Sequence, residues 1–202
     1  MTILPNFIVF EGGDGSGRTT QLQLIAEYHT TKKLWITAEP TDSPLGCFIR
    51  ELLHSELTVQ PETLAMLFAA DRHEHLYAPN GIIERCSRGE TVICDRYILS
   101  SLVYQGLTCG ESLPVSLNKN FPLPSLIVFF DIDPAQALAR IGNRLVKDSY
   151  EQYAFQTQIR ERYRRLLPHY AKKGCCITTV NAAETVEEVQ KTVQKLLNHA
   201  SI

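Results

Sequence analysis

The sequence predicts an α/β protein with a five-stranded parallel sheet flanked by helices. Five short apolar runs, rich in β-branched and aromatic residues, recur along the 202-residue chain. Segments with helical periodicity separate these runs, and glycine-rich or charged residues follow the ends of several of them. Strands that alternate with helices form right-handed βαβ units, which give a parallel sheet. Ligands of such sheets bind beyond the carboxyl ends of the strands, where these polar residues are expected.

The first half of the chain supplies three predicted strands. A continuous apolar run predicts a buried strand over 7–10, and a helix over 19–28 follows a glycine-rich turn. A second apolar run predicts a strand over 34–37. A stripe of leucine and isoleucine then predicts a helix over 44–57, and Pro61 suits the first turn of a helix over 61–76. The third strand, over 91–94, ends immediately before Asp95.

The second half continues the alternation. A helix is expected over 97–104. Residues 107–124 are rich in Gly, Pro, Asn and Ser, so a loop with at most one short helix is expected there. The remaining strands are predicted over 126–130 and 176–180. The remaining helices are predicted from 134 to about 145, over 151–170 and over 186–197. Because the chain has no internal repeat and no long linker, we expect one domain over 1–202.

Composition excludes several classes of protein. A formal net charge of −2 and a pI near 6.3 argue against a protein that binds nucleic acid through basic charge. No apolar run approaches the roughly 18 residues of a membrane helix, and the start of the chain does not resemble a signal peptide. The six cysteines lack metal-site spacing, so we interpret them as reduced thiols of a cytoplasmic protein. The six histidines show no metal-ligand constellation.

A glycine-rich segment after the first strand predicts a phosphate-binding loop. It reads Gly12-Gly13-Asp14-Gly15-Ser16-Gly17-Arg18-Thr19-Thr20, the pattern G-x-x-x-x-G-K-[ST] with arginine in place of lysine. Backbone N–H groups of such a loop and the following helix N-terminus bind the phosphates of ATP. The Thr19 hydroxyl is placed to ligate Mg²⁺, and Arg18 keeps the positive charge for the β- and γ-phosphates. The alternative is a glycine-rich turn without a ligand.

Charged and aromatic side chains farther along the chain suggest a second site, for a molecule that would accept a phosphoryl group from ATP. Asp95 and Arg96 directly follow a strand, where a carboxylate can organise Mg²⁺ and an arginine can clamp phosphates. The alternative is a strand-end salt bridge. Phe68 and Arg72 lie one helical turn apart and offer a flat apolar surface beside hydrogen-bond donors, which suits a pyrimidine base. A core phenylalanine with a surface arginine is the competing interpretation.

Two further groups of residues are candidates for contact with a ligand. Three polar side chains share one face of the helix after Asp95, either for ligand contact or for ordinary packing: Ser101, Tyr104 and Gln105. Arg140 and Arg144 lie one turn apart after the fourth strand and would repel each other without a bound anion. They predict a lid that closes over phosphates, at about 140–150; a solvated helix face is the alternative.

Taken together, these motifs resemble the thymidylate kinase family, in its short bacterial form. The matching segments span nearly the whole chain: Phe10-Glu11-Gly12-x-Asp14-Gly15-x-Gly17-x-Thr19-Thr20, Glu39-Pro40, Pro44-Leu45-Gly46-x-x-Ile49-Arg50, Leu67-Phe68-Ala69-Ala70-Asp71-Arg72, Asp95-Arg96-Tyr97-x-x-Ser100, Tyr104-Gln105-Gly106 and Glu151-x-x-x-Phe155. The resemblance implies the fold of P-loop nucleoside monophosphate kinases. It also implies transfer of the ATP γ-phosphate to dTMP with Mg²⁺, in a homodimer.

The resemblance also implies roles for individual residues. Phe68 would stack on thymine and Arg72 would bond its O4, while Ser101 and Gln105 would contact the base. Tyr104 would occupy the place of a ribose 2′-OH.

Arg96 would hold phosphates, Asp95 would help to bind Mg²⁺, and Asp14 would lie near the acceptor sugar. Glu11 and Glu39 would support the Mg²⁺ and water network around the acceptor. Gly15 replaces the phosphate-loop arginine of the eukaryotic form, so Arg140 or Arg144 in the lid would be catalytic.

The chain departs from the family pattern at Arg18, in place of lysine, at Ala38 before Glu39-Pro40, and at Asn181 in the adenine-side loop. Two other functions therefore stay open: a nucleotide-binding relic with impaired turnover, and a kinase for another pyrimidine monophosphate. A GTPase is disfavoured because the chain lacks an N/T-K-x-D motif.

Overall fold

The computed structural model describes residues 2–28, 33–142 and 149–199, and these confirm the predicted five-stranded parallel sheet. The strand order is β2-β3-β1-β4-β5, and every neighbouring pair is parallel. The strands are β1 Ile3–Gly12, β2 Leu34–Ala38, β3 Thr91–Asp95, β4 Leu123–Asp131 and β5 Cys176–Asn181. β2 and β3 lie on one side of β1, and β4 and β5 lie on the other. Doubly wound sheets bind their ligands beside such a switch point.

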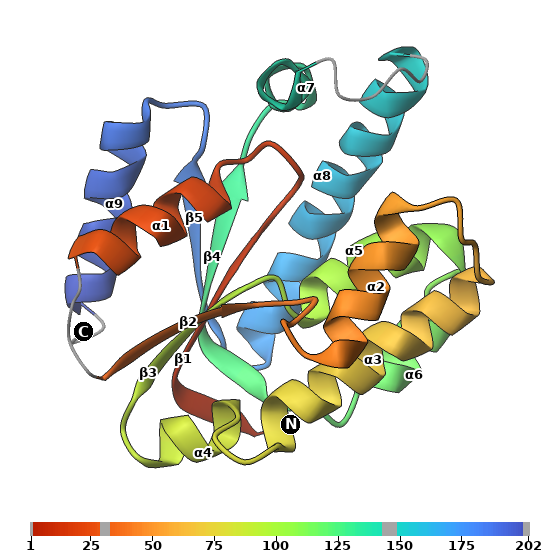
Figure 1. Cartoon of the computed structure of the whole chain (residues 1–202). Coiled ribbons are helices and arrows are strands. Elements are labelled where there is room, and N and C mark those ends of the chain that lie inside the picture. The colour runs from red at the N-terminus through yellow and green to blue at the C-terminus, as the bar shows by residue number, and fades with distance from the viewer. Residues whose placement is uncertain (1, 29–32, 143–148, 200–202) are drawn as a thin grey trace.

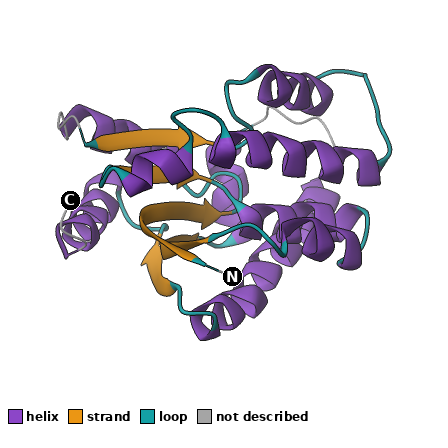
Figure 2. Cartoon of the chain, turned by 90° about the horizontal axis from the view of Figure 1, so that it is seen from below, coloured by secondary structure: helices purple, strands orange, loops and turns teal. Residues whose placement is uncertain are grey.

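Helices cover both faces of the sheet (Figures 1 and 2). They are α1 Arg18–Tyr28, α2 Pro44–His54, α3 Pro61–Tyr77, α4 Ile82–Ser87, α5 Ile98–Thr108, α6 Ser112–Asn118, α7 Pro134–Ile141, α8 Ser149–Lys172 and α9 Val186–His199. None of the helices within the described ranges is long and apolar enough to cross a membrane.

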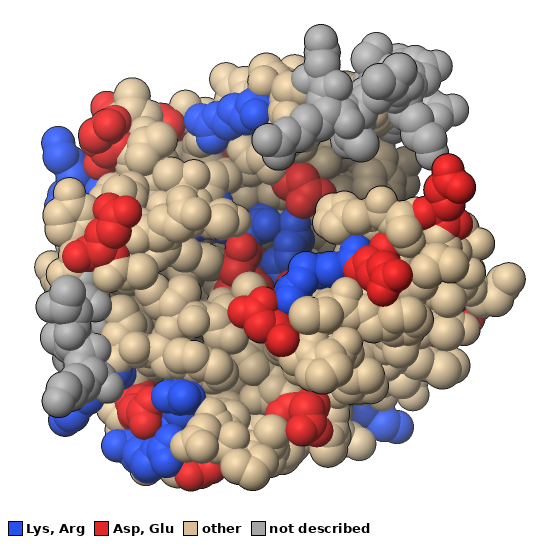
Figure 3. Space-filling model, in the orientation of Figure 1, with Lys and Arg blue, Asp and Glu red and all other residues tan. Residues whose placement is uncertain are grey.

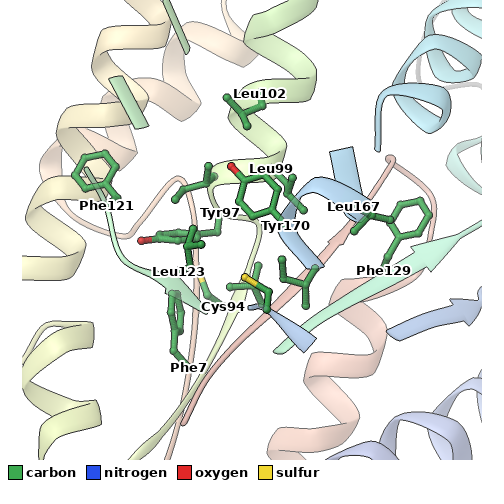
Figure 4. Packing of buried hydrophobic residues seen from close by; sticks show 14 of the residues in the cluster. Phe7, Cys94, Tyr97, Leu99, Leu102, Phe121, Leu123, Phe129, Leu167 and Tyr170 are labelled. Carbon is green, nitrogen blue, oxygen red and sulfur yellow. The ribbon is translucent and has the colours of Figure 1, made fainter. Parts of the chain in front are cut away.

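The alternating side chains of β1 show how the sheet divides the core into two layers. Phe7 and Val9 pack in a cluster with residues of α3, α4, α5 and α8, part of which Figure 4 shows. Ile8 and Phe10 point to the opposite face and pack with residues of α1 and α9. All four side chains are almost completely buried, and each such burial contributes about 1.5–3 kcal/mol to folding. The central strand is therefore firmly held just before the phosphate loop begins.

The structure differs from the sequence prediction mainly in residues 78–124. Helix α4 was not predicted, because six residues are too few to show a clear helical period. The expected loop at 107–124 contains α6 and the start of β4, in addition to the end of α5. Helix α7 ends at Ile141 rather than near 145, where Gly142 adopts a φ of 69°. Residues 143–148, where the predicted helix and lid continue, lie outside the described residues.

The carboxyl ends of the strands bring the predicted site residues together. Phe10 of β1 pairs with Asp95 of β3, and Ala38 of β2 pairs with the same residue. The phosphate loop, Glu39 and Arg96 therefore leave the sheet at one edge. Figure 3 shows basic and acidic side chains close together inside a hollow on this face of the molecule.

Candidate active site

The phosphate loop connects β1 to α1, as its sequence predicts. Gly15 has a φ of +76°, and a Cβ atom there would lie 2.4 Å from the carbonyl oxygen of Ala137. A side chain is therefore excluded by both backbone conformation and space. Helix α1 begins at Arg18, so its first-turn N–H groups and its dipole point back toward the loop. Inward N–H groups and a helix N-terminus suit an anion such as a nucleotide phosphate, and the binding of ATP here stays a prediction.

Arg18 folds back into the loop and is almost completely buried. Its Nη1 donates to the carbonyl oxygens of Gly12 and Gly13, at 2.8 Å for Gly13, and to the Ser16 hydroxyl at 3.1 Å. Its Nε donates to Oδ1 of Asp95 at 2.6 Å. The guanidinium therefore joins the loop to the end of β3, and its contacts with phosphate remain a prediction.

Thr19 and Asp95 offer oxygen atoms for a metal ion. The Thr19 hydroxyl lies 3.4 Å from Oδ2 of Asp95, the carboxylate oxygen that does not accept from the Arg18 Nε. A hydroxyl beside a carboxylate suits a hard cation such as Mg²⁺. The residues that the sequence assigns to the metal are therefore adjacent, and their donor chemistry fits such an ion.

Arg96 follows β3 in a backbone conformation that is rare for residues other than glycine, with a φ of 68°. Its backbone N–H donates to the carbonyl oxygen of Phe10 at 2.9 Å. Its side chain donates to Oδ1 of Asp14 at 2.5 Å and to Gly12 O at 3.4 Å, and its guanidinium lies over the Tyr104 ring. The tight turn thus directs a cation back toward the phosphate loop.

Glu11 anchors the start of α5 behind Arg96. Its carboxylate accepts from the backbone N–H groups of Tyr97 and Ser100 and from the hydroxyls of Ser100 and Tyr163. Complete burial disfavours the charged form and raises the pKa of Glu11, although these hydrogen bonds act in the opposite direction. The protein's own donors therefore occupy the carboxylate that the resemblance placed in a Mg²⁺ and water network.

A cavity of about 410 Å³ opens beside Arg96 and contains the predicted acceptor residues. Its walls include Asp14, Glu39, Phe68, Arg72, Arg96, Ser101, Tyr104 and Gln105. The structure thus brings together residues from the phosphate loop, the end of β2, α3 and α5. Sequence reasoning missed Leu53 and His54 at the end of α2, which also line this cavity. No motif marks them, since the end of a helix stripe looks the same whether or not it borders a cavity.

Arg72 lies in the wall of this cavity and is only 1% exposed. Its Nε and Nη2 donate to Oε2 of Glu39 at 2.9 and 2.6 Å. The other carboxylate oxygen of Glu39 lies 3.1 Å from Nδ1 of His75. The structure therefore places Glu39 behind Arg72, where both of its oxygens are already paired. Its predicted role in the Mg²⁺ and water network around the acceptor stays a prediction.

The loop after Glu39 is fixed by a buried carboxylate of α3. Asp71 accepts from the Thr41 backbone N–H at 2.8 Å and from the hydroxyls of Thr41 and Ser43. Ser43 also caps α2, accepting from the backbone N–H of Gly46. The same helix that carries Arg72 thus holds the segment that leads from β2 to α2.

Tyr104 bridges the cavity and the phosphate loop. Its hydroxyl donates to Oδ2 of Asp14 at 3.2 Å and lies 3.4 Å from Nη2 of Arg96. Its ring also contacts the Phe155 ring of α8, at a centroid distance of 6.4 Å. These contacts fix the position of the phenol at the point where the two regions meet.

Of the two predicted lid arginines, the structure describes only Arg140. Its Nη1 donates to the carbonyl oxygen of Ala182 at 2.7 Å and lies 4.0 Å from where a Cβ on Gly17 would be. It therefore sits between the phosphate loop and the segment after β5. Arg144 lies outside the described residues. The catalytic roles of both arginines stay predictions.

A group of buried ligand-type side chains lies behind the cavity. Glu39, His75 and Cys94 place one possible ligand atom each within 4.8 Å of one another. Their atoms have other partners, however. His75 contacts Glu39 and the Thr37 hydroxyl, and the Cys94 thiol donates to the carbonyl oxygen of Arg96. Burial also raises the pKa of the Cys94 thiol, which disfavours the thiolate that a metal needs.

Known proteins share much of this sequence. The sequence profile of the family described as thymidylate kinase matches residues 10–193. A Treponema pallidum protein that bears the name "Putative thymidylate kinase" is 37% identical over 203 residues. The match covers 98% of this chain and 96% of that protein. A similarly named Pyrococcus horikoshii protein is 36% identical and covers 96% of each chain. One from Methanococcus maripaludis is 42% identical over 165 residues, 80% of this chain and 77% of its own. Because the profile and these relatives span most of the sequence, this chain belongs to the thymidylate kinase family.

Proposed function

We propose that this protein transfers the γ-phosphoryl group of ATP to dTMP, giving ADP and dTDP, and that the whole chain acts as one kinase domain. The observation that supports this most strongly is the position of Arg96. Its guanidinium lines the acceptor cavity and also contacts Gly12 and Asp14 of the phosphate loop. Two nucleotides bound at these two places would meet at this cation.

The donor side is assigned to the phosphate loop. Backbone N–H groups of residues 12–20 and the N-terminus of α1 would bind the ATP phosphates. Arg18 would exchange its internal partners for phosphate oxygens. Arg140, with Arg144, would add positive charge near the transferred group. This assignment rests on the motif and on the family resemblance.

The acceptor side is assigned to the 410 Å³ cavity. Phe68, which is half-buried, would stack on the thymine ring, and Arg72 would donate to its O4. Ser101 and Gln105 would contact the base. Tyr104, held by Asp14, would occupy the space of a ribose 2′-OH and so favour a deoxynucleotide.

In the reaction, an oxygen of the dTMP phosphate forms a bond to the γ-phosphorus while the bond from the γ-phosphorus to the β-γ bridging oxygen breaks. The attacking group is already an anion, so no strong general base is needed. The protein's part is to align the two nucleotides and to offset the charge on the moving phosphoryl group, with Arg18 and Arg96 nearest to it.

A divalent metal is expected of an ATP-dependent kinase, and we propose Mg²⁺. Thr19 and Oδ2 of Asp95 would hold it or its water ligands. When bound, the ion would neutralise negative charge on the ATP phosphates.

We also propose a homodimer, as the resemblance implies, and a cytoplasmic location, which the interpretation of the six cysteines as reduced thiols favours. Three neighbouring helices carry exposed apolar side chains that a second copy could cover: Phe48 on α2, Met66 on α3 and Val115 on α6. Analytical ultracentrifugation of the wild type and of Met66→Glu tests this, because a charge there should shift a dimer toward monomer. A wild type that sediments as a monomer would contradict it.

The activity is tested by coupled ADP release with a panel of acceptors: dTMP, dUMP, UMP, CMP and AMP. We expect turnover to be fastest with dTMP and to require a divalent metal. No ADP formation with dTMP across a wide range of Mg²⁺ would overturn the proposed function. A preference for a ribonucleotide would instead refute the role given to Tyr104.

A further inference from the structure

Arg72 has five N–H groups, and the described part of the chain pairs four of them. Nε donates to Glu39, Nη2 donates to Glu39 and to the Ser101 hydroxyl, and Nη1 donates to Oδ1 of Asn118. One N–H on Nη1 is left. Arg72 is among the residues that line the 410 Å³ cavity, so a ligand there would pair with this last donor.

Asn118 fixes the atom that carries this donor. Its Nδ2 donates to the carbonyl oxygen of Pro114 at 2.8 Å. A carbonyl can only accept, so this bond sets the orientation of the amide and turns Oδ1 toward Arg72. The side chain is 3% exposed and belongs to α6, an element that supplies no other partner to Arg72.

Asn118 does not line the acceptor cavity itself. Any effect on a bound base must therefore pass through Arg72. Glu39 and Ser101 restrain Nε and Nη2, whereas Asn118 is the described partner of Nη1. Without it, Nη1 would have two unpaired N–H groups, and the guanidinium could tilt about its contacts with Glu39.

We propose that Asn118 is a positioning residue that sets base specificity, by presenting a single Arg72 donor toward position 4 of a pyrimidine. This inference rests on the proposed function. A carbonyl at that position, as in thymine or uracil, accepts the donor. An amino group, as in cytosine, meets it donor against donor and leaves both unpaired, which is the kind of mismatch that binding sites reject strongly.

The test compares Asn118→Leu with Asn118→Asp and with Asn120→Ala, an exposed control residue close in sequence. Binding of dTMP and dCMP is measured by calorimetry, and kcat and KM are measured for both. Leucine should weaken dTMP binding about 10- to 100-fold, by loss of an ordered charge-assisted hydrogen bond, and should weaken dCMP binding much less. The KM for dTMP should rise while kcat changes by less than about threefold, because the phosphates are held elsewhere.

Asn118→Asp keeps an oxygen that can accept from Arg72 but loses the bond to Pro114, so it should recover only part of the preference for dTMP, and Asn120→Ala should match the wild type. The inference is overturned if Asn118→Leu keeps the wild-type ratio of dTMP to dCMP affinity within about twofold. If leucine prevents folding, Asn118→Ala is measured against the same criterion. A wild type that neither binds nor phosphorylates dTMP would instead overturn the proposed function, so the two failures are distinguishable.

Discussion

The proposed base side and the proposed phosphate side of the site differ in how their arginines are paired. Arg72 on the base side is buried and paired with Glu39, Ser101 and Asn118, while its cavity lies open beside it. On the phosphate side, Arg18 and Arg96 contact carboxylates and loop carbonyls at the place where phosphates are expected. The proposed base side is thus preorganised, whereas on the proposed phosphate side Arg18 and Arg96 would have to exchange internal contacts for those of a nucleotide.

The difference has a physical cause. A base is neutral and needs a donor held at one angle, so the guanidinium can be locked by protein partners on every other side. Phosphates carry several negative charges, so cations that move into contact with them gain favourable electrostatic interactions. Until they bind, Arg18 and Arg96 are stabilised by Asp95 and Asp14.

The largest expected effect concerns the buried pair on the base side. Replacing Glu39 by alanine leaves the Arg72 guanidinium buried with its main counter-charge removed. We expect the free energy of unfolding to fall by about 3–5 kcal/mol, as measured by urea unfolding. Asp42→Ala is the matched control. Its partner Arg50 forms an exposed pair, and such pairs contribute little. Similar losses in the two variants would show that the base side is not the rigid part of the site.

The next effect concerns Arg18, the only basic residue of the phosphate loop segment 12–20. Arg18→Ala should lower kcat/KM for ATP by about 10²-fold or more, as loss of a charge-stabilising donor does elsewhere. Calorimetry should find dTMP affinity within about twofold of the wild type, because Arg18 does not line the acceptor cavity. A parallel loss of dTMP affinity would contradict the separation of the two sides.

Arg18→Lys sharpens this result. Lysine keeps the charge, so activity should stay within about tenfold of the wild type. If the wild type shows no turnover and lysine creates it, the protein is a nucleotide-binding relic rather than a working kinase. Steady-state ADP release measures both variants.

The smallest effect concerns Asp131, outside the two nucleotide regions. Partial burial opposes its ionisation, but hydrogen bonds from Arg160 and Arg164 outweigh this and lower the pKa of Asp131 below the ordinary 3.8. A lowered pKa gives stability that is present above pH 3.8 and is lost as the pH falls below it. Asp131→Asn should therefore cost about 1–2 kcal/mol at pH 7 and progressively less below pH 4. Urea unfolding across pH measures this. A cost that does not change with pH would contradict the assignment.

The sequence predicted the sheet and the phosphate loop well because both depend on local patterns. Apolar runs define the five strands, and the spacing of glycines before Thr19 defines the loop. Residues near strand ends, such as Asp95 and Arg96, could also be placed at one edge, since parallel strands share the direction of their carboxyl ends.

The partners of those residues could not be predicted in the same way. Asn118 lies in a segment that was expected to be mostly loop, and only tertiary packing brings it to Arg72. Glu39 was expected to support the Mg²⁺ and water network around the acceptor, but in the structure Arg72 and His75 already pair with its two oxygens. Pairing between elements far apart in the chain leaves no periodic signal, so these contacts became visible only in the structure.

The most direct test of this account is calorimetric titration of dTMP into the wild-type protein without ATP or metal. Because the base side is already organised, we predict saturable binding of one dTMP per chain, with much weaker binding of dCMP. Absence of binding heat at several temperatures, or equal affinity for the two nucleotides, would contradict the claim that this cavity is a prebuilt thymine site.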